Sequence, residues 1–288
     1  MNHAGVNPQK TAVAVIPARF ASSRLPGKPL LDIAGKPMIC RVVERALAAS
    51  RVGQVIVATD DERVLETVRA FGYEAVMTRT DHASGTDRLA EVALSINDDG
   101  IVVNVQGDEP LISPDTIDLA IEALLADTAC SIATTWEPIE TIADVLNPDL
   151  VKVVLDDRDH ALYFSRSPIP YPREVARRYG SITTALENEP ELLNQFRKHT
   201  GLYVYRREFL LEFARWPQST LERAESLEQL RALEHGVQIK VVRSTAGSIG
   251  VDTLDDLERV RREVSSLESN IPVSQASAAP VQPDVPQR

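Results

Sequence analysis

Cysteine is scarce in this chain of 288 residues: only Cys40 and Cys130 occur, far apart and without a Cys-x-x-Cys pair. A disulfide framework is therefore not expected. Cys40 falls within a helical pattern and Cys130 begins a strand pattern, so both are interpreted as small buried hydrophobes. This usage predicts a protein of a reducing, cytoplasmic compartment.

Long apolar runs and an excess of basic residues are also missing. No stretch approaches the length of a membrane span. The short apolar run Thr11–Pro17 is followed by Arg19, which favours a first strand over a signal peptide. The net charge of −11 leaves no surplus of Lys and Arg to offset nucleic-acid phosphates. We therefore expect neither membrane insertion nor nucleic-acid binding, and any phosphate site must be a local basic pocket.

Strand and helix patterns alternate through the first half of the chain. Strands are expected at Val13–Ile16, Gln54–Ala58, Ala75–Met77 and Ile101–Val105. Helices are expected from Pro37, from Asp60-Asp61 through Ala70, from Thr86 through Leu94, and from Ser113-Pro114 to about Leu125. Repeated strand–helix–strand units predict an α/β fold with a parallel, doubly wound sheet.

The second half is less regular, and the Pro-rich text of Ser165–Pro172 excludes regular structure there. Strands are expected at Val151–Leu155, Ala161–Phe164, Leu202–Tyr205 and Ile239–Val242, and helices at Phe209–Ala214, Leu221–Leu233 and Leu254–Val264. We interpret residues 1–10 as a flexible arm and 11–264 as the folded domain. Residues 265–288 have no apolar period, which predicts a disordered tail.

The loop after the first strand, residues 17–29, carries Arg19, Arg24 and Lys28 among small residues such as Ala18. It is not a P-loop, because Pro29 follows the lysine. Arg clasps phosphate oxygens with two hydrogen bonds, and small residues let backbone N–H groups approach a triphosphate. A solvated basic loop is the alternative, but three cations at the carboxyl end of a first strand favour a phosphate site.

Residues 105–110 read Val-Gln-Gly-Asp-Glu-Pro and follow the buried run Ile101–Val105. Asp108 is thereby expected on a tight loop at the carboxyl end of a strand, where ligands bind in open α/β sheets. The alternative is an ordinary turn with a capping Asp, but two adjacent carboxylates at a strand end repel and cost stability unless a cation or hydrogen bonds offset them. Asp252 alone reads as a helix N-cap. Paired with Asp108 across the sheet, it would complete a two-carboxylate cation site.

Other polar residues carry less information by themselves. Arg79, His82, Ser84 and Thr86 suit either a base- or sugar-reading loop or ordinary turn and capping roles. A second set of polar residues is scattered along the chain and indicates no function by itself. It comprises Tyr163, Ser165, Arg166, His199, Tyr203, Glu228 and Gln229.

Taken in order, the motifs resemble those of 3-deoxy-D-manno-octulosonate (Kdo) cytidylyltransferases, the CMP-Kdo synthetases, over roughly residues 11–264. The matching segments are Ile16-Pro17-Ala18-Arg19, Arg24–Leu30, Ala58-Thr59-Asp60, Thr78–Thr86, Asn104–Pro110, Val151–Val154, Ala161–Arg166, His199–Tyr203, Leu227–Arg231 and Gly250–Thr253. Leu254-Asp255 stands where the family often has Pro-Glu, and the tail beyond residue 265 has no counterpart.

The resemblance implies a Rossmann-like nucleotide-diphospho-sugar transferase fold with a mostly parallel sheet, a nucleotide-binding half at about 11–135, and a smaller sugar-acid and dimerisation part at about 136–249. It implies a cytoplasmic homodimer of lipopolysaccharide biosynthesis that uses CTP, Kdo and Mg²⁺.

The same resemblance assigns site residues. The nucleotide would meet Ala18, Arg19, Arg24, Lys28, Arg79, Ser84, Gln106 and Gly107. The sugar acid would meet Arg166, His199, Tyr203, Glu228 and Gln229. Asp108 and Asp252 would hold magnesium and, with Lys28 and Arg19, carry the catalysis.

Two rival functions remain at this stage. A CMP-sialic acid synthetase or another sugar nucleotidyltransferase shares the opening loop but usually lacks the Gln-Gly-Asp-Glu-Pro motif with His199 and Gln229. A catalytically silent nucleotide-binding protein tends to lose a metal carboxylate or the loop lysine, whereas Lys28, Asp108 and Asp252 are all present. Whether the sugar is Kdo or a close amino analogue is open.

Overall fold

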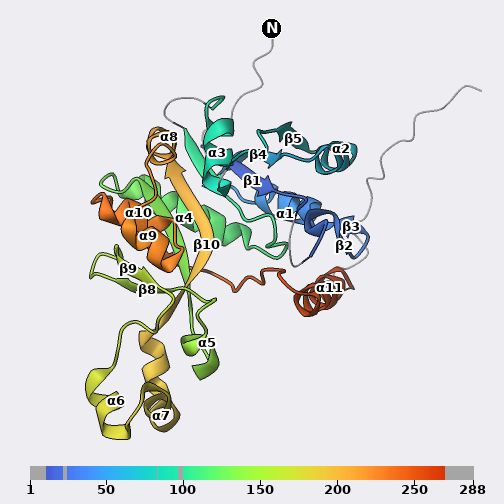
Figure 1. The fold of residues 1–288 in the computed structure, drawn as a ribbon. Coiled ribbons are helices and arrows are strands. Elements are labelled where there is room, and N and C mark those ends of the chain that lie inside the picture. The colour runs from blue at the N-terminus through green and yellow to red at the C-terminus, as the bar shows by residue number, and fades with distance from the viewer. Residues whose placement is uncertain (1–10, 22–24, 83, 97–99, 270–288) are drawn as a thin grey trace, which may run out of the picture.

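A nine-stranded mixed sheet organises the part of the chain that this computed structural model describes, residues 11–21, 25–82, 84–96 and 100–269 (Figure 1). The main path of the sheet has the strand order β11-β7-β10-β6-β1-β4-β5, and β8 and β9 branch from β10. The strands are β1 (Ala12–Ala18), β4 (Val52–Thr59), β5 (Glu74–Met77), β6 (Ile101–Asn104), β7 (Ile132–Pro138), β8 (Lys152–Leu155), β9 (Ala161–Ser165), β10 (Arg197–Arg206) and β11 (Ile239–Arg243).

The main path of the sheet is mostly parallel, which confirms the prediction from the alternating pattern. β1 pairs in parallel with β4 and β6, β4 with β5, and β7 with β11. The long strand β10 is inserted antiparallel between β6 and β7. All four residues of β6 are buried, as expected for a strand that is covered on both faces.

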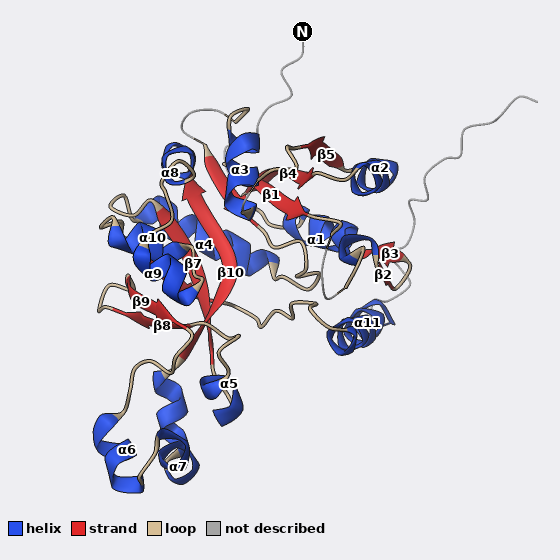
Figure 2. Ribbon diagram, viewed as in Figure 1, coloured by secondary structure: helices blue, strands red, loops and turns tan. Residues whose placement is uncertain are grey.

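Helices cover both faces of this sheet (Figure 2). One face packs against α1 (Met38–Leu47), α2 (Glu62–Ala70) and α4 (Pro114–Ala126) in a single apolar cluster. The other face packs against α3 (Gly85–Ala93), α8 (Arg207–Phe213), α9 (Thr220–Glu225) and α10 (Gln229–Glu234). This two-sided cover is the doubly wound arrangement that strand–helix alternation produces.

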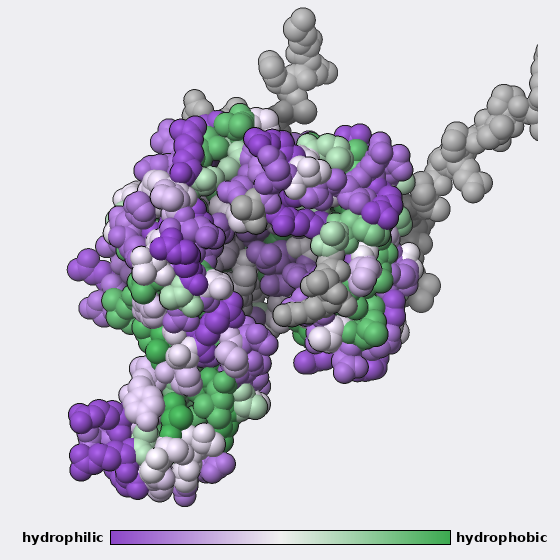
Figure 3. Space-filling view, in the orientation of Figure 1, coloured by the Kyte–Doolittle hydropathy of each residue, from purple (hydrophilic) through white to green (hydrophobic). Residues whose placement is uncertain are grey.

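A smaller lobe projects from the far ends of β7 and β10 and lies at the bottom of Figure 1. It is formed by α5 (Ile142–Leu146), α6 (Arg173–Tyr179), α7 (Ile182–Asn188) and the 3₁₀ turn η2 (Pro190–Gln195). The lobe has its own small core, which includes Val145, Leu186 and Phe196. Apolar residues also gather on its surface in the space-filling view (Figure 3).

The last helix, α11 (Leu254–Ser269), returns to the N-terminal half of the chain. It packs on the two-residue strand β2 (Asp32–Ile33), which pairs with β3 (Lys36–Pro37), and Val251, Leu257 and Val260 are buried against Ile33 and Met38. The segment that precedes α11 therefore runs beside the loops at the carboxyl ends of β1 and β6, far away in sequence.

Some boundaries differ from expectation. Ser84, not Thr86, caps α3, and it forms a capping box with Asp87 while Thr86 is buried inside the helix. The helix expected over Leu221–Leu233 is two short helices separated by Ser226 at φ 53°. Apolar spacing continues across that break, so periodicity alone does not reveal it.

The tail prediction was wrong at its start, because α11 continues through Ser269. Residues 270–288 and the expected arm at 1–10 lie outside the described residues. None of the described helices combines the length and apolar character that a membrane span requires.

Candidate active site

A cavity of about 330 Å³ opens at the carboxyl ends of β1 and β6. This is the edge at which parallel α/β sheets bind ligands. The lining combines the basic loop with the Gln-Gly-Asp motif: Pro17, Ala18, Arg19, Ala21, Lys28, Pro29, Met38, Gln106, Gly107 and Asp108.

Lys28 is held in this cavity by a tight turn. Gly27 adopts a left-handed conformation at φ 70°, which favours glycine, and it leads into the 3₁₀ turn η1 (Lys28–Leu30). The Lys28 backbone N–H donates to the Leu25 carbonyl at 3.1 Å. The lysine side chain is 14% exposed and points toward two carboxylates.

Those carboxylates belong to Asp108 and Asp252, which converge on one nitrogen. Lys28 Nζ lies 2.7 Å from Asp108 Oδ2 and 2.9 Å from Asp252 Oδ1. The backbone also joins the two loops, because the Val251 N–H donates to the Asp108 carbonyl at 2.9 Å. Burial by itself lowers the pKa of Lys28, but both carboxylates outweigh it and raise the pKa above 10.5. Two carboxylates that already share one cation are suited to bind a divalent cation with oxygen ligands.

Gly107 is required by the close approach of two strand ends. A Cβ at this position would lie 2.8 Å from the Pro17 carbonyl oxygen, which real Cβ contacts do not tolerate. Its neighbour Gln106 donates from Nε2 to the Gly201 carbonyl on β10 at 2.9 Å. The motif is thereby fixed on one side by β1 and on the other by β10.

A second cavity, of about 310 Å³, lies on the other side of the same loop, where Glu109 takes part in its wall. Its lining comes from several separate segments: Glu109, Glu137, Asp149, Leu150, Val151, Lys198, His199, Thr200, Gly201, Tyr203, Leu227, Gln229, Ser248 and Gly250. The sequence assigned His199, Tyr203 and Gln229 together to a sugar acid, and the structure brings these three side chains to one cavity.

Polar and aromatic groups give the second cavity its character. The His199 Nε2 atom lies 2.9 Å from Thr134 Oγ1, and its ring packs 5.3 Å from that of Tyr203. Burial lowers the pKa of His199 to about 3, so its ring is neutral near pH 7. Burial likewise raises the pKa of Tyr203 well above 10.0, which keeps its hydroxyl protonated.

Negative charge in the second cavity is partly compensated. Lys198 Nζ lies 2.5 Å from Glu137 Oε2. Burial raises the pKa of Glu109 to about 7, and the neighbouring Asp108 adds to the rise. Acidic groups therefore outnumber their cations around the junction of the two cavities, which favours the entry of a further cation.

Four other predicted residues lie apart from these cavities. The Arg79 guanidinium is 69% exposed and pairs with Asp81. Ser84 and Glu228 line a third cavity, of about 600 Å³, beside α3 and α10. Arg166 donates to the carbonyl oxygens of Pro148, Glu225 and Ser226, and it is not among the lining residues of the second cavity. Arg24 lies outside the described residues.

Several polar residues that line the second cavity were not assigned a role from the sequence, among them Glu109, Lys198 and Ser248. Glu109 stands inside the motif that was singled out, so its position was a usable signal. Lys198 directly precedes His199 in a strand, and adjacent side chains of a strand normally face opposite sides of the sheet. A register shift in β10 between Thr200 and Tyr203 disturbs that alternation nearby.

The fold and these adjoining cavities define a nucleotidyltransferase of the α/β class. The chain belongs to the cytidylyltransferase family. The model of that family, described as "Cytidylyltransferase", matches residues 13–239.

Curated relatives are similar over most of the chain. A "3-deoxy-manno-octulosonate cytidylyltransferase" of Syntrophotalea carbinolica is 52% identical over 254 residues, which covers 88% of this chain and 98% of the relative. The protein of the same name from Geobacter sulfurreducens is 53% identical, with 86% and 96% covered.

A solved structure agrees with these relatives. It is that of a CMP:2-keto-3-deoxy-manno-octonic acid synthetase complexed with CTP, and it matches with a TM-score of 0.79 and 47% identity. The match covers 90% of this chain and all of that one.

Proposed function

We propose that this cytidylyltransferase activates 3-deoxy-D-manno-octulosonate: CTP and the sugar acid give CMP-Kdo and pyrophosphate. The observation that carries the proposal is the shared loop at residues 106–109. Asp108 lines the cavity that contains Arg19 and Lys28, whereas Glu109 lines the cavity that contains His199, Tyr203 and Gln229. Two substrates held on either side of one loop meet at its edge, as a transfer reaction requires.

The reaction joins two anions, so charge neutralisation is its main requirement. In the proposed step the anomeric hydroxyl oxygen bonds to the α-phosphorus of CTP and releases its proton to solvent, and the bond from that phosphorus to the bridging oxygen of pyrophosphate breaks. Lys28 and Arg19 supply positive charge in the first cavity, where the departing pyrophosphate accumulates negative charge. These two side chains would stabilise the leaving group.

The second cavity suits a hydroxylated sugar acid. Neutral His199 and Gln229 both donate and accept hydrogen bonds, and the ring of Tyr203 offers an apolar face. Lys198 is the cation in this lining, and we assign to it the sugar carboxylate. Arg166 would act indirectly, by holding the turn at Glu225 and Ser226 through its backbone hydrogen bonds.

We propose Asp108 and Asp252 as the ligands of Mg²⁺. Their oxygens already meet around the Lys28 ammonium, and the donor set is the hard oxygen type that Mg²⁺ prefers. When bound, the ion would polarise a phosphoryl oxygen and reduce the charge on the triphosphate. Lys28 would then move its hydrogen bonds from the carboxylates to the nucleotide.

We further propose a cytoplasmic homodimer that supplies lipopolysaccharide biosynthesis. The projecting lobe supports the dimer, because Leu146 is 38% and Tyr171 is 59% exposed there. Light scattering on the purified full chain tests this state, and a monomeric mass at micromolar concentration would contradict it.

The activity is tested by pyrophosphate release from CTP, with and without Mg²⁺. The panel of acceptors contains Kdo, its 8-amino analogue and N-acetylneuraminate. We expect turnover with Kdo, dependence on Mg²⁺, and at least a hundredfold preference over N-acetylneuraminate. Turnover of N-acetylneuraminate alone would assign a sialic acid substrate, and CTP binding without turnover of any acceptor would indicate a silent nucleotide-binding protein.

A further inference from the structure

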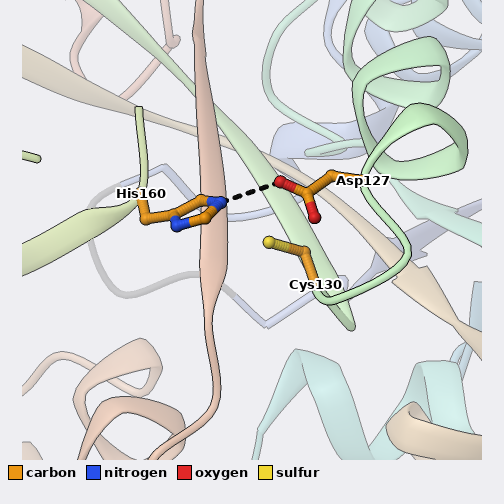
Figure 4. Close-up of side chains that lie close together, drawn as sticks. All are labelled: Asp127, Cys130 and His160. Atoms are coloured by element: carbon orange, nitrogen blue, oxygen red, sulfur yellow. Dashed lines mark hydrogen bonds and ion pairs between the residues drawn. The ribbon is translucent and has the colours of Figure 1, made fainter. Parts of the chain in front are cut away.

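A separate group of side chains, of the types that can ligate metals, lies between the end of α4 and the turn of the β8–β9 hairpin. The carboxylate of Asp127, the thiol of Cys130 and the imidazole of His160 have their donor atoms within 4.8 Å of one another (Figure 4). None of these three residues lines the cavities described above. The group is therefore independent of the proposed transfer reaction.

The fold fixes these residues from two sides. The Cys130 N–H donates to the Asp127 carbonyl at 3.2 Å in the turn between α4 and β7. Arg206 on β10 holds this turn, since its Nε donates to the Cys130 carbonyl at 3.0 Å. On the hairpin, the His160 N–H donates to Asp156 Oδ1 at 2.8 Å. The three donors thus converge because of backbone structure, and a ligand would find them already assembled.

The Asp127 carboxylate forms hydrogen bonds with both of the other side chains. His160 Nε2 lies 2.8 Å from Asp127 Oδ2, and this hydrogen bond lowers the pKa of the Asp127 carboxyl. Cys130 is 1% exposed, and burial, with Asp127 beside it, raises its pKa to about 11. Such a thiol stays protonated and is a poor nucleophile, which argues against a catalytic role for the cysteine alone.

We infer that Asp127, Cys130 and His160 bind a divalent transition-metal ion, of which Zn²⁺ is the best match. Sulfur, imidazole nitrogen and carboxylate oxygen are its usual ligands, whereas Mg²⁺ takes oxygen ligands. Tetrahedral zinc places its donors roughly 3.5 Å apart, so the present cluster needs shifts of only about an ångström. Loss of the thiol proton leaves two negative charges on the ligands, and these balance the ion.

The surroundings supply what a three-ligand site needs. Asp156 Oδ2 lies 3.6 Å from His160 Nδ1, the position of a carboxylate that orients a metal-bound imidazole. The side chains of His160 and Asp127 are 10% and 23% exposed, so water can reach a fourth coordination position. A bound ion would tie the α4–β7 turn to the β8–β9 hairpin.

Cobalt titration of the full-length protein tests this inference. The protein is first stripped with a chelator, and Co²⁺ is then added in the Asp108→Asn background, which removes one carboxylate of the proposed magnesium site. We expect one Co²⁺ per chain with thiolate-to-cobalt absorption in the near ultraviolet. Equimolar Zn²⁺ should abolish that absorption, and a large excess of Mg²⁺ should leave it unchanged.

Matched variants assign the ligands. Cys130→Ser should abolish the thiolate band, whereas Cys40→Ser, a substitution at the other buried cysteine, should retain it. His160→Gln keeps the thiol and should weaken Co²⁺ binding at least tenfold, so it decides the question even if Cys130→Ser fails to fold. Absence of the band in the parent protein, its persistence in Cys130→Ser, or unchanged affinity in His160→Gln would each overturn the inference.

Discussion

The two cavities that adjoin residues 106–109 differ in how they are built. The first presents Lys28 between two carboxylates, so its chemistry is that of full charges. The second presents neutral His199 and aromatic Tyr203, with Lys198 already paired to Glu137. One short motif thus lies between a site suited to neutralise charge and a site suited to recognise its ligand by hydrogen bonds. Substitutions on the first side should therefore affect turnover and CTP, and those on the second side should affect the acceptor.

The largest expected effect is that of Asp108→Asn. The change keeps the size of the side chain but removes a charge from the proposed Mg²⁺ site, and we expect kcat/KM to fall on the order of 10² to 10³-fold. Steady-state pyrophosphate release measures the loss. Asp157→Asn makes the same charge change at an exposed hairpin residue and should be silent. Near-parental turnover of Asp108→Asn would remove Asp108 from the metal role.

Lys28→Ala should produce the next largest effect. It removes the charge that we assign to triphosphate binding, and the KM for CTP should rise about 10- to 100-fold while the KM for the sugar acid changes little. Lys36→Ala, which removes a surface lysine paired with Glu44, provides the control. Unchanged kinetics at limiting CTP would contradict the assignment of Lys28 to phosphate binding.

Lys198→Ala and Arg166→Ala separate direct from indirect recognition of the acceptor. The first removes the cation of the second cavity, so the KM for the sugar acid should rise roughly tenfold. The second removes hydrogen bonds to three carbonyl groups and should lower the melting temperature. If Arg166→Ala instead affects only the sugar-acid KM, then Arg166 contacts the substrate directly.

The smallest expected effect is that of His199→Gln on the pH dependence of folding stability. The pKa of His199 is about 3 in the folded chain against 6.5 for the free group, so unfolding takes up a proton between these values. The contribution of His199 to the free energy of unfolding is therefore fully present above pH 6.5, and it is lost as the pH falls toward 3. At pH 5.5 the free energy of unfolding is therefore lower by about 1 kcal/mol than it is above pH 6.5, because of His199 alone.

Urea unfolding of the parent and His199→Gln proteins at pH 7.5 and pH 5.5 measures that difference. The variant should lose less stability on acidification than the parent. Equal losses in the two proteins would show that His199 titrates normally in the folded state.

Local sequence patterns predicted much of the fold because they depend on neighbouring residues. Ile101–Val105 and Ser113-Pro114 marked a strand and a helix start correctly, and Asp61 caps α2 as expected. The break at Ser226 was missed because it depends on a backbone conformation that the apolar period does not encode. The lobe helices α6 and α7 were missed because Pro-rich text precedes them.

For the site, the sequence identified the loops but not where each side chain points. Lys28, Asp108 and Gln106 stand next to strand ends, so strand topology alone brought them together. The direction of Arg166 depends on carbonyl groups from residues 148 and 225–226, and no local pattern contains that information. The convergence of Asp252 on Lys28 spans 224 positions and rests on the packing of α11.

The hydrogen bond from Val251 to Asp108 also has a consequence for biosynthesis. A nascent chain released just after β11 contains every strand of the sheet yet lacks one member of the acidic pair. With Asp252 in its proposed role, a ribosome that stalls before codon 252 would yield a product that lacks one of the two proposed magnesium ligands. After a proteolytic cut between β11 and α11, the proposed cation site would depend on the packing of α11 alone.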